Sequence, residues 1–251
     1  MVENKLRLGY HSLVSVCYII GASWALFFCD FTSATDERVL DMQRYGGRYL
    51  TTWNFIFHIL YFGVALNGDF LLMNSSCTSC ISTVSKIKGY LFTCFLVPCS
   101  TYVVTVFWSL FNYDRDLVYP LATDAVVPLW FNHLVHSMTF VFMILEFYFT
   151  DINTIPSLES VLLGFSCLNV AYYSILFYTK SKTGRYFYGI FHLLSTWQLI
   201  LFILGTFISC LFIIKGGMLL QQTIHDKKHQ KINKLDLNQH KKVNGNEKWI
   251  L

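Results

Sequence analysis

Six apolar stretches alternate with short polar segments along the chain of 251 residues. Each stretch is near or above the roughly 20 residues that a helix needs to cross the hydrocarbon core of a bilayer. The polar segments are too short to form a separate soluble domain. The pattern therefore predicts an all-α polytopic membrane bundle of six transmembrane helices within residues 1–220, followed by a polar, Lys-rich and poorly ordered tail at 221–251. The predicted helices cover residues 10–29, 50–73, 90–111, 125–149, 158–178 and 188–214.

The composition agrees with this membrane setting. Hydrophobic residues make up 54% of the chain and charged residues 14%, whereas a soluble domain is about 25% charged. The formal net charge is +4, and seven of the 19 Lys and Arg residues lie in the tail beyond Gly217. The positive charge belongs to this tail and does not indicate a nucleic-acid-binding face. We expect the bilayer as a partner and no nucleic acid, while the sequence identifies no protein partner.

The first apolar stretch has two interpretations. Lys5 and Arg7 precede it and Thr32-Ser33-Ala34 follows it, in the order of the basic region and cleavage site of a secretory signal peptide. Its apolar part, however, is longer than the 7–15 residues of a typical signal-peptide core. We therefore expect this stretch to remain in the protein as the first membrane helix.

Basic residues near the helix ends predict the orientation. Cytosolic loops of membrane proteins carry an excess of Lys and Arg, and six alternating helices place most of these residues on one side. Both termini are then cytosolic, and the acidic segments 36–41 and 114–124 face the lumen or the exterior. The loop at 180–185 disagrees, because its basic residues fall on the outer side. We predict an integral, multi-pass protein of the endoplasmic reticulum or the plasma membrane. The cytosolic basic residues are Lys5, Arg7, Lys86, Lys88 and the lysines of the tail.

The eight cysteines do not predict a disulfide framework, because most of them lie within apolar helices, where cysteine behaves as a small hydrophobic residue. Only Cys77 and Cys80 have a suggestive C-x-x-C spacing. A zinc site would need a second such pair. We interpret the two as an ordinary reduced pair, and palmitoylation at the membrane edge is the alternative.

The histidines His133 and His136 have the spacing of a metal-binding box. Membrane di-iron enzymes need several boxes to fill two coordination spheres, but the other histidines are scattered singly or lie in the tail. A single box supplies too few ligands. We therefore predict neither a metal nor another cofactor.

Polar side chains inside membrane helices are costly, which makes them functional candidates by default. Thr51, Asn54 and His58 cluster on one face of the second predicted helix. Asn132 and His136 form a similar polar stripe on the fourth. Both stripes avoid lipid if they face one another across the bundle interior. A hydroxyl and an imidazole would then be available for nucleophilic catalysis; hydrogen bonding between helices without catalysis is the alternative.

Several short motifs, taken in chain order, resemble the androgen-induced-gene family, which also contains the androgen-dependent regulator of tissue factor pathway inhibitor. The most specific are Trp-x-Asn-His-x-x-His and Tyr-Asp-Arg-Asp-x-x-Tyr-Pro. The resemblance extends from the second predicted helix to at least the fifth. The motifs are Tyr45-Gly46-Gly47-Arg48, Leu50-Thr51, Tyr61-Phe62-Gly63, Val97-Pro98-Cys99-Ser100-Thr101, Phe107-Trp108, Tyr113-Asp114-Arg115-Asp116, Val118-Tyr119-Pro120 and residues 130–136.

The resemblance implies a multi-pass membrane hydrolase that cleaves fatty acid esters of hydroxy fatty acids. It places the nucleophile at Thr51, not Thr52, and the general base at His136. The reaction passes through an acyl-enzyme. The chain departs from the family at His58, where a glutamine is expected, and at Gly189, where a proline is expected.

Other side chains are candidates to assist such a carboxylic ester hydrolase. Helical backbone amides are already bonded, so the oxyanion stabiliser must be a side chain or a helix end. Asn54, Asn132 and His133 are the candidates, and His58 is a further polar neighbour. Arg115 either attracts the free carboxylate of the substrate or forms a structural ion pair. The alternative to this enzyme of lipid metabolism is a non-catalytic multi-pass membrane regulator or adaptor.

Overall fold

The structure is a computed structural model, and it describes residues 2–32, 34–74, 77–150 and 154–246. These residues form helices and no strands, as the all-α prediction requires. The long helices are α1 (Val2–Phe27), α3 (Leu50–Asn74), α4 (Thr78–Leu91), α5 (Val97–Asp114), α8 (Leu158–Thr183) and α10 (Thr196–Asn246). The short helices are α2 (Glu37–Tyr45), α6 (Leu129–His133), α7 (Thr139–Glu146) and α9 (Ile190–Leu193).

Within the described residues, five helical segments are long and apolar enough to cross a membrane. They support a multi-pass membrane protein. The count of six spans and the cytosolic termini stay predictions. The fourth predicted helix is divided into α6 and α7, which a π-helical turn at Leu134–Met138 joins. The five segments are Asn4–Phe27, Leu50–Asn74, Thr78–Leu117, Leu158–Thr183 and Thr196–Lys228.

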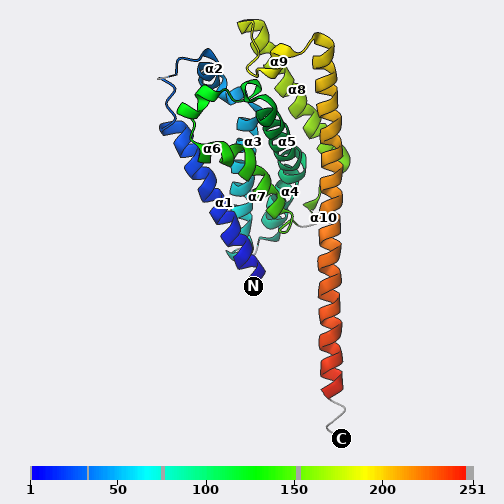
Figure 1. Cartoon of the computed structure of the whole chain (residues 1–251). Coiled ribbons are helices and arrows are strands. Elements are labelled where there is room, and N and C mark those ends of the chain that lie inside the picture. The colour runs from blue at the N-terminus through cyan, green and yellow to red at the C-terminus, as the bar shows by residue number, and fades with distance from the viewer. Residues whose placement is uncertain (1, 33, 75–76, 151–153, 247–251) are drawn as a thin grey trace.

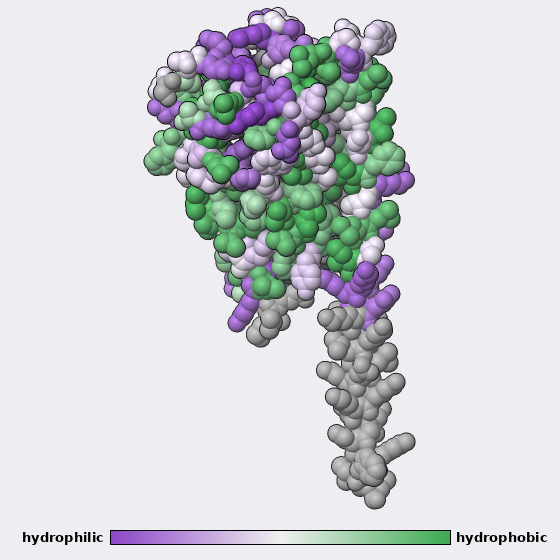
Figure 2. Space-filling view, in the orientation of Figure 1, coloured by the Kyte–Doolittle hydropathy of each residue, from purple (hydrophilic) through white to green (hydrophobic). Residues whose placement is uncertain are grey.

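The long helices run up and down one bundle, and the start of α1 and the end of α10 point to the same end of it (Figure 1). The helices α2 and α9 lie at the opposite end (Figure 1). Figure 2 shows a hydrophobic band around the middle of this face, with hydrophilic residues above and below it. A spanning protein needs this distribution, because the hydrocarbon core offers polar groups no water to bond with.

The helix α1 is part of the folded core. Its residues Val14 and Tyr18 are buried in a cluster shared with α3, at 0% and 1% exposure. Gly21 lets α1 approach the π-helical turn between α6 and α7 closely, because a Cβ atom at this position would lie 2.5 Å from Cδ2 of Leu134. The first apolar stretch is thus a helix that the rest of the bundle packs against. Ser33, from the alternative cleavage site, lies outside the described residues.

The helix α2 begins with a charged cap. Asp36 is its N-cap residue and accepts a hydrogen bond from the backbone N–H of Arg38 at 2.8 Å. The guanidinium of Arg38 also bonds to this carboxylate, and together these contacts hold the pKa of Asp36 below its usual range. The carboxylate therefore stays ionised near neutral pH and continues to cap the helix.

Two π-helical turns interrupt the long helices. The first, Phe92–Leu96, joins α4 to α5 just before Pro98, whose ring removes a backbone donor and crowds the preceding turn. The second, Leu134–Met138, contains His136. Such turns occur as single bulges inside α-helices, frequently at functional sites. The apolar pattern did not predict them. A π-helical turn adds one residue to a turn of α-helix, and the stretch remains as apolar as before.

The C-terminal part of the chain differs from its prediction. The last helix was expected at 188–214, but α10 begins at Thr196, after α9, and continues to Asn246. The predicted tail from Gln221 is thus helical as far as Asn246, and its poor order stays a prediction. The physical reason for the helix is that residues 221–246 contain no proline and are rich in Lys and Gln, which are good helix formers.

The pair Cys77 and Cys80 also differs from its prediction. We expected reduced thiols, but the structure joins them in a disulfide at the start of α4. The first helical turn brings their Cα atoms to 5.4 Å, which is within the range that a disulfide spans. The C-x-x-C spacing is compatible with this closeness, but the spacing alone does not distinguish a disulfide from two reduced thiols.

Candidate active site

The hydroxyl group of Thr51 lies at the start of α3. The chain reaches α3 from a 3₁₀ turn at Gly46–Arg48, and Tyr49 is extended, with a φ of −74° and a ψ of 137°. The carbonyl oxygen of Tyr49 accepts the N–H groups of Thr52 and Trp53 at 3.0 and 3.2 Å. These bonds start the helix and place Thr51 in its first turn, at the end of the bundle that carries α2.

The partner of Thr51 is His136 in the π-helical turn. Thr51 Oγ1 lies 3.2 Å from His136 Nε2. The other ring nitrogen, Nδ1, lies 3.0 Å from the backbone carbonyl oxygen of Asn132 and 2.7 Å from its side-chain oxygen. A carbonyl oxygen only accepts hydrogen bonds, so Nδ1 carries the proton and Nε2 presents its lone pair to Thr51. This is the tautomer that a general base for Thr51 requires.

An aromatic contact fixes the ring plane of His136. Phe107 of α5 stacks on the imidazole with ring centroids 3.5 Å apart and planes 11° from parallel. The histidine is 8% exposed, so packing on its face and bonds at both nitrogens leave the ring little freedom. The structure thus brings the two polar stripes of the second and fourth predicted helices face to face.

A cavity opens beside Thr51. It lies between α3, α5, α8, α9 and α10 and has a volume of about 870 Å³, which includes the space at its opening. Its walls are mainly apolar and aromatic, which suits long hydrocarbon chains. Phe107 belongs both to this wall and to the stack on His136. The lining residues are Leu50, Thr51, Cys99, Tyr102, Val103, Val106, Phe107, Leu110, Val118, Phe165, Leu168, Asn169, Tyr172, Tyr173, Tyr188, Ile190, Phe191, Phe202, Thr206 and Cys210.

Asn54 and His58, on the Thr51 face of α3, are fully buried and do not line this cavity. His58 Nε2 lies 3.0 Å from the carbonyl oxygen of Thr139, and Asn54 Oδ1 accepts a hydrogen bond from Ser100 at 3.1 Å. These contacts join α3 to α7 and α5. The Nδ2 atom of Asn54 has no hydrogen-bond partner among the described residues. Both side chains therefore support helix packing next to Thr51.

Two other predicted site residues also lie outside the cavity. His133 stacks on Trp108 with ring centroids 5.2 Å apart, and its Nδ1 lies 3.2 Å from Ser137 Oγ. Arg115 pairs with Asp124 at 2.7 Å. The structure thus gives Arg115 the contacts of a structural ion pair and gives His133 a place in the packing between α5 and the π-helical turn.

The two histidines of the His-x-x-His spacing face different partners. His136 bonds to Thr51 and Asn132, whereas His133 lies beside Ser137. Among the residues that the structure describes, no three His, Cys, Asp or Glu side chains gather in an arrangement that could hold a metal ion.

Tyr188 is a polar neighbour of Thr51 that sequence reasoning missed. Its hydroxyl accepts the backbone N–H of Leu50 at 3.1 Å and interacts with the side chains of Thr51 and Tyr172. It also lines the cavity. Tyr188 lies between α8 and α9, where no helical periodicity marks it. The available signal was its place at the end of an aromatic cluster, Tyr186-Phe187-Tyr188.

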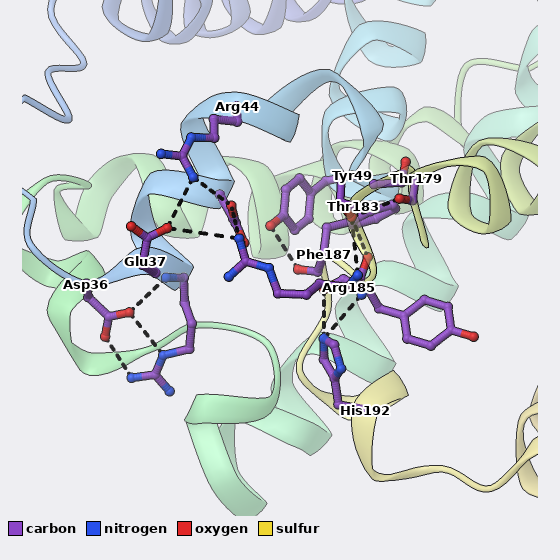
Figure 3. Close-up of polar contacts among 12 residues, drawn as sticks. Asp36, Glu37, Arg44, Tyr49, Thr179, Thr183, Arg185, Phe187 and His192 are labelled. Carbon is purple, nitrogen blue, oxygen red and sulfur yellow. Dashed lines mark hydrogen bonds and ion pairs between the residues drawn. The ribbon is translucent and has the colours of Figure 1, made fainter. Parts of the chain in front are cut away.

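The segment that carries Tyr188 is bound to the region of α2 and the start of α3 (Figure 3). Tyr49 donates a hydrogen bond to the carbonyl oxygen of Phe187 at 2.9 Å. Arg185 pairs with Asp41 of α2 at 3.4 Å. We call α2 together with residues 184–192 the polar cap. It lies at the Thr51 end of the bundle.

A second group of polar residues missed by sequence reasoning lies at the opposite end of the bundle. His11 of α1 lies between two carboxylates, with Nδ1 2.6 Å from Asp69 and Nε2 3.0 Å from Glu146. Arg7 pairs with Asp69 at 2.6 Å, and Lys88 pairs with Glu146 at 3.0 Å. These five residues, the charged cluster, join α1, α3, α4 and α7. They come from four separate helices, so the sequence pattern did not connect them.

Comparison with known proteins places the chain in a family. The sequence model of FAR-17a/AIG1-like proteins matches residues 11–222. The chain belongs to the FAR-17a/AIG1-like family. The androgen-dependent TFPI-regulating protein of Mesocricetus auratus is 31% identical over 201 residues, 79% of this chain and 84% of that protein. The protein of the same name from Rattus norvegicus is 36% identical over 175 residues, which cover 69% of this chain and 75% of that protein.

A more distant relative is the androgen-induced gene 1 protein of Homo sapiens, 24% identical over 221 residues, which cover 84% of this chain and 92% of that protein. No solved structure matches the chain. As a FAR-17a/AIG1-like protein, the chain has both Thr51 and His136 within the matched range. The names of the relatives state no reaction, so the chemistry is argued from the site.

Proposed function

We propose that this protein is an intramembrane lipid esterase, a carboxylic ester hydrolase that acts on fatty acid esters of hydroxy fatty acids. The observation that supports the proposal most is the 3.2 Å contact between Thr51 Oγ1 and His136 Nε2 at an apolar cavity. A hydroxyl beside a neutral imidazole of the correct tautomer meets the first requirement of nucleophilic ester hydrolysis. An ester of two acyl chains suits both the cavity and a membrane of the endoplasmic reticulum or cell surface.

Thr51 attacks the ester carbonyl in the first half of the reaction. A threonine hydroxyl is a poor nucleophile until a base removes its proton, and neutral imidazole is suited to this near physiological pH. His136 Nε2 takes the proton as the bond from Oγ1 to carbon forms. It then returns the proton to the departing hydroxy fatty acid. Asn132 accepts from Nδ1 throughout and so stabilises the imidazolium.

Water completes the reaction by attacking the acyl-enzyme. His136 takes a proton from this water and returns it to the Thr51 oxygen as the fatty acid leaves. Thr51 lies in the first turn of α3, at the end of the bundle that carries the polar cap. This position gives water a shorter path than a site at the bundle centre would. The scheme uses no metal and no cofactor.

The substitution Thr51→Ala tests the nucleophile, and Thr52→Ala is its matched control. Thr52 Oγ1 donates to the carbonyl oxygen of Gly46 at 2.7 Å, so its hydroxyl is engaged away from His136. Thr51→Ala should abolish both ester hydrolysis and labelling by a lipophilic fluorophosphonate, whereas Thr52→Ala should retain both. Mass spectrometry should map the label to Thr51. Equal turnover in the wild type and both variants would rule out this nucleophile.

A non-catalytic membrane regulator or adaptor is the alternative function. The name of the relatives from Mesocricetus auratus and Rattus norvegicus describes regulation. A regulator of this kind needs neither a nucleophile nor a cavity, so Thr51→Ala would leave its cellular effect intact and the purified protein would hydrolyse no ester. The contact between Thr51 and His136 beside the cavity favours the enzyme.

A further inference from the structure

Ester hydrolysis at Thr51, on which this inference rests, needs a hydrogen-bond donor for the oxyanion. Negative charge develops on the carbonyl oxygen as the nucleophile attacks, and preorganised donors aimed at that oxygen supply a large part of catalysis. The donor must reach into the cavity. Asn132 does not line the cavity, and its side-chain oxygen accepts from Nδ1 of His136. Asn54 and His133 lie outside the cavity, so none of the three expected side chains meets the requirement.

We infer that Tyr188 donates the hydrogen bond that stabilises the oxyanion formed at Thr51. The Tyr188 hydroxyl lies against the first turn of α3, 3.1 Å from the backbone nitrogen of Leu50, and interacts with the Thr51 side chain. Both residues line the same cavity. A carbonyl carbon within bonding reach of Thr51 Oγ1 therefore has its oxygen close to the Tyr188 hydroxyl.

The hydrogen-bond inventory leaves the proton of Tyr188 available for the substrate. A phenolic hydroxyl has one proton and also accepts hydrogen bonds through its oxygen. The oxygen accepts the N–H of Leu50, and the Tyr172 side chain is its second neighbour. Donors to this oxygen polarise the O–H bond and strengthen it as a donor. The proton of Tyr188 is then available to the carbonyl oxygen of an ester bound at Thr51.

The backbone on both sides of Tyr188 is fixed. On one side, the carbonyl oxygen of Phe187 accepts the hydrogen bond from Tyr49 at 2.9 Å (Figure 3). On the other side, Gly189 packs closely against the turn after α5, because a Cβ atom there would lie 2.9 Å from the carbonyl oxygen of Asp116. A donor held in this way needs no reorganisation when charge develops.

The acylation step balances with Tyr188 in this role. Thr51 Oγ1 bonds to the carbonyl carbon, its proton moves to His136 Nε2, and the π electron pair moves to the carbonyl oxygen. Tyr188 donates a hydrogen bond to that oxygen and keeps its proton. The electron pair returns as the ester C–O bond breaks, and His136 protonates the leaving alkoxide. Tyr188 thus contacts a reacting atom and ends the step unchanged.

The substitution Tyr188→Phe removes the hydroxyl and keeps the ring, and Tyr186→Phe is its matched control. Tyr186 belongs to the same aromatic cluster, but it does not line the cavity. In the purified full-length protein, kcat should fall about 10²-fold in Tyr188→Phe, the effect of one lost oxyanion donor, with KM little changed. Tyr186→Phe should keep the wild-type kcat. An unchanged kcat in Tyr188→Phe overturns the inference.

A long-chain alkyl trifluoromethyl ketone separates the oxyanion contact from cavity packing. Thr51 adds to this ketone and forms a tetrahedral oxyanion, whereas the corresponding methyl ketone measures packing alone. Tyr188→Phe should weaken inhibition by the trifluoromethyl ketone in proportion to the loss in kcat/KM and leave binding of the methyl ketone unchanged. Equal weakening for both ketones assigns Tyr188 to packing and overturns the inference.

Thr51→Ala distinguishes the failure of this inference from the failure of the proposed function. An inactive Thr51→Ala protein beside a fully active Tyr188→Phe protein overturns the role of Tyr188 alone, whereas an active Thr51→Ala protein overturns both. If Tyr188→Phe does not fold, 3,5-difluorotyrosine at position 188 replaces it. This residue keeps the hydroxyl but ionises at lower pH, and an ionised phenol cannot donate. Turnover should then fall with rising pH earlier than in the wild type; an identical pH profile overturns the inference.

Discussion

His136 and His11 are both buried, and both have partners at each ring nitrogen, but His136 contacts the start of α3 and His11 contacts the end of α3. His136 faces a threonine hydroxyl and the carbonyl oxygens of Asn132, none of which is charged. His11 faces the carboxylates of Asp69 and Glu146. A cavity adjoins the first site, whereas His11 is enclosed at 0% exposure and lines no described cavity.

The comparison shows that the partners of a buried histidine decide whether its proton can move. Uncharged acceptors on one side of His136 leave Nε2 free to take a proton from Thr51 and to give it back. Two carboxylates hold a protonated His11 by charge-assisted bonds at both nitrogens. Arg7 and Lys88 balance the charges of Asp69 and Glu146, and a protonated His11 adds one further positive charge. The charged cluster therefore links the helices, whereas the uncharged site around His136 is suited to proton transfer.

The largest expected effect is on stability, at the charged cluster. Glu146→Ala removes the carboxylate that His11, Lys88 and Tyr61 share. Breaking a buried ion pair leaves an uncompensated charge and costs about 3–5 kcal/mol. Thermal unfolding in detergent should show a large fall in midpoint, while kcat of the protein that remains folded should be close to the wild-type value.

Glu159→Ala is the control for that experiment, because Glu159 is an exposed carboxylate in the first turn of α8. Its loss should change stability by only about 0.3–1 kcal/mol, the effect of a charge near a helix end. Equal unfolding midpoints for Glu146→Ala and Glu159→Ala would contradict the role given to the charged cluster.

The next effect is on turnover, at the uncharged site. His136→Ala removes the proposed general base and should lower kcat at least about 10²-fold, with little change in the amount of folded protein. His133→Ala is the control, since its ring packs on Trp108 outside the cavity. Chelators should leave wild-type turnover unchanged. Activity that disappears with a chelator and returns with iron or zinc would defeat the mechanism of Thr51 and His136.

The smallest perturbation locates the two ends of the bundle relative to the membrane. Asn74-Ser75-Ser76 fits a glycosylation acceptor, although Ser75 and Ser76 lie outside the described residues. Asn74 ends α3 on the side of the charged cluster, which the basic residues predict to be cytosolic. It should carry no glycan, whereas an acceptor engineered near Ser33, in the segment between α1 and α2, should be used. A glycan on Asn74 in a glycosylating host would invert the topology.

The sequence by itself determined where most helices lie. The helix α3 spans Leu50–Asn74 against a predicted 50–73, and α8 starts at Leu158 as predicted. A membrane helix needs a continuous apolar run, which is a local property and therefore visible in the pattern. The same reasoning singled out the polar stripes that contain Thr51 and His136, because a polar residue in lipid must face the interior, and helical spacing shows which residues share a face. The resemblance to the family then pointed to these two residues within the stripes.

Only the tertiary structure decided how those residues are used. The pairing of Thr51 with His136, and the acceptors that set the histidine tautomer, depend on two helices and a π-helical turn that meet in space. The position of Tyr188 depends on the polar cap, and the partners of His11 come from two other helices, α3 and α7. Such contacts join residues far apart in the chain, and their geometry is fixed by packing, which leaves no periodic signal in the sequence.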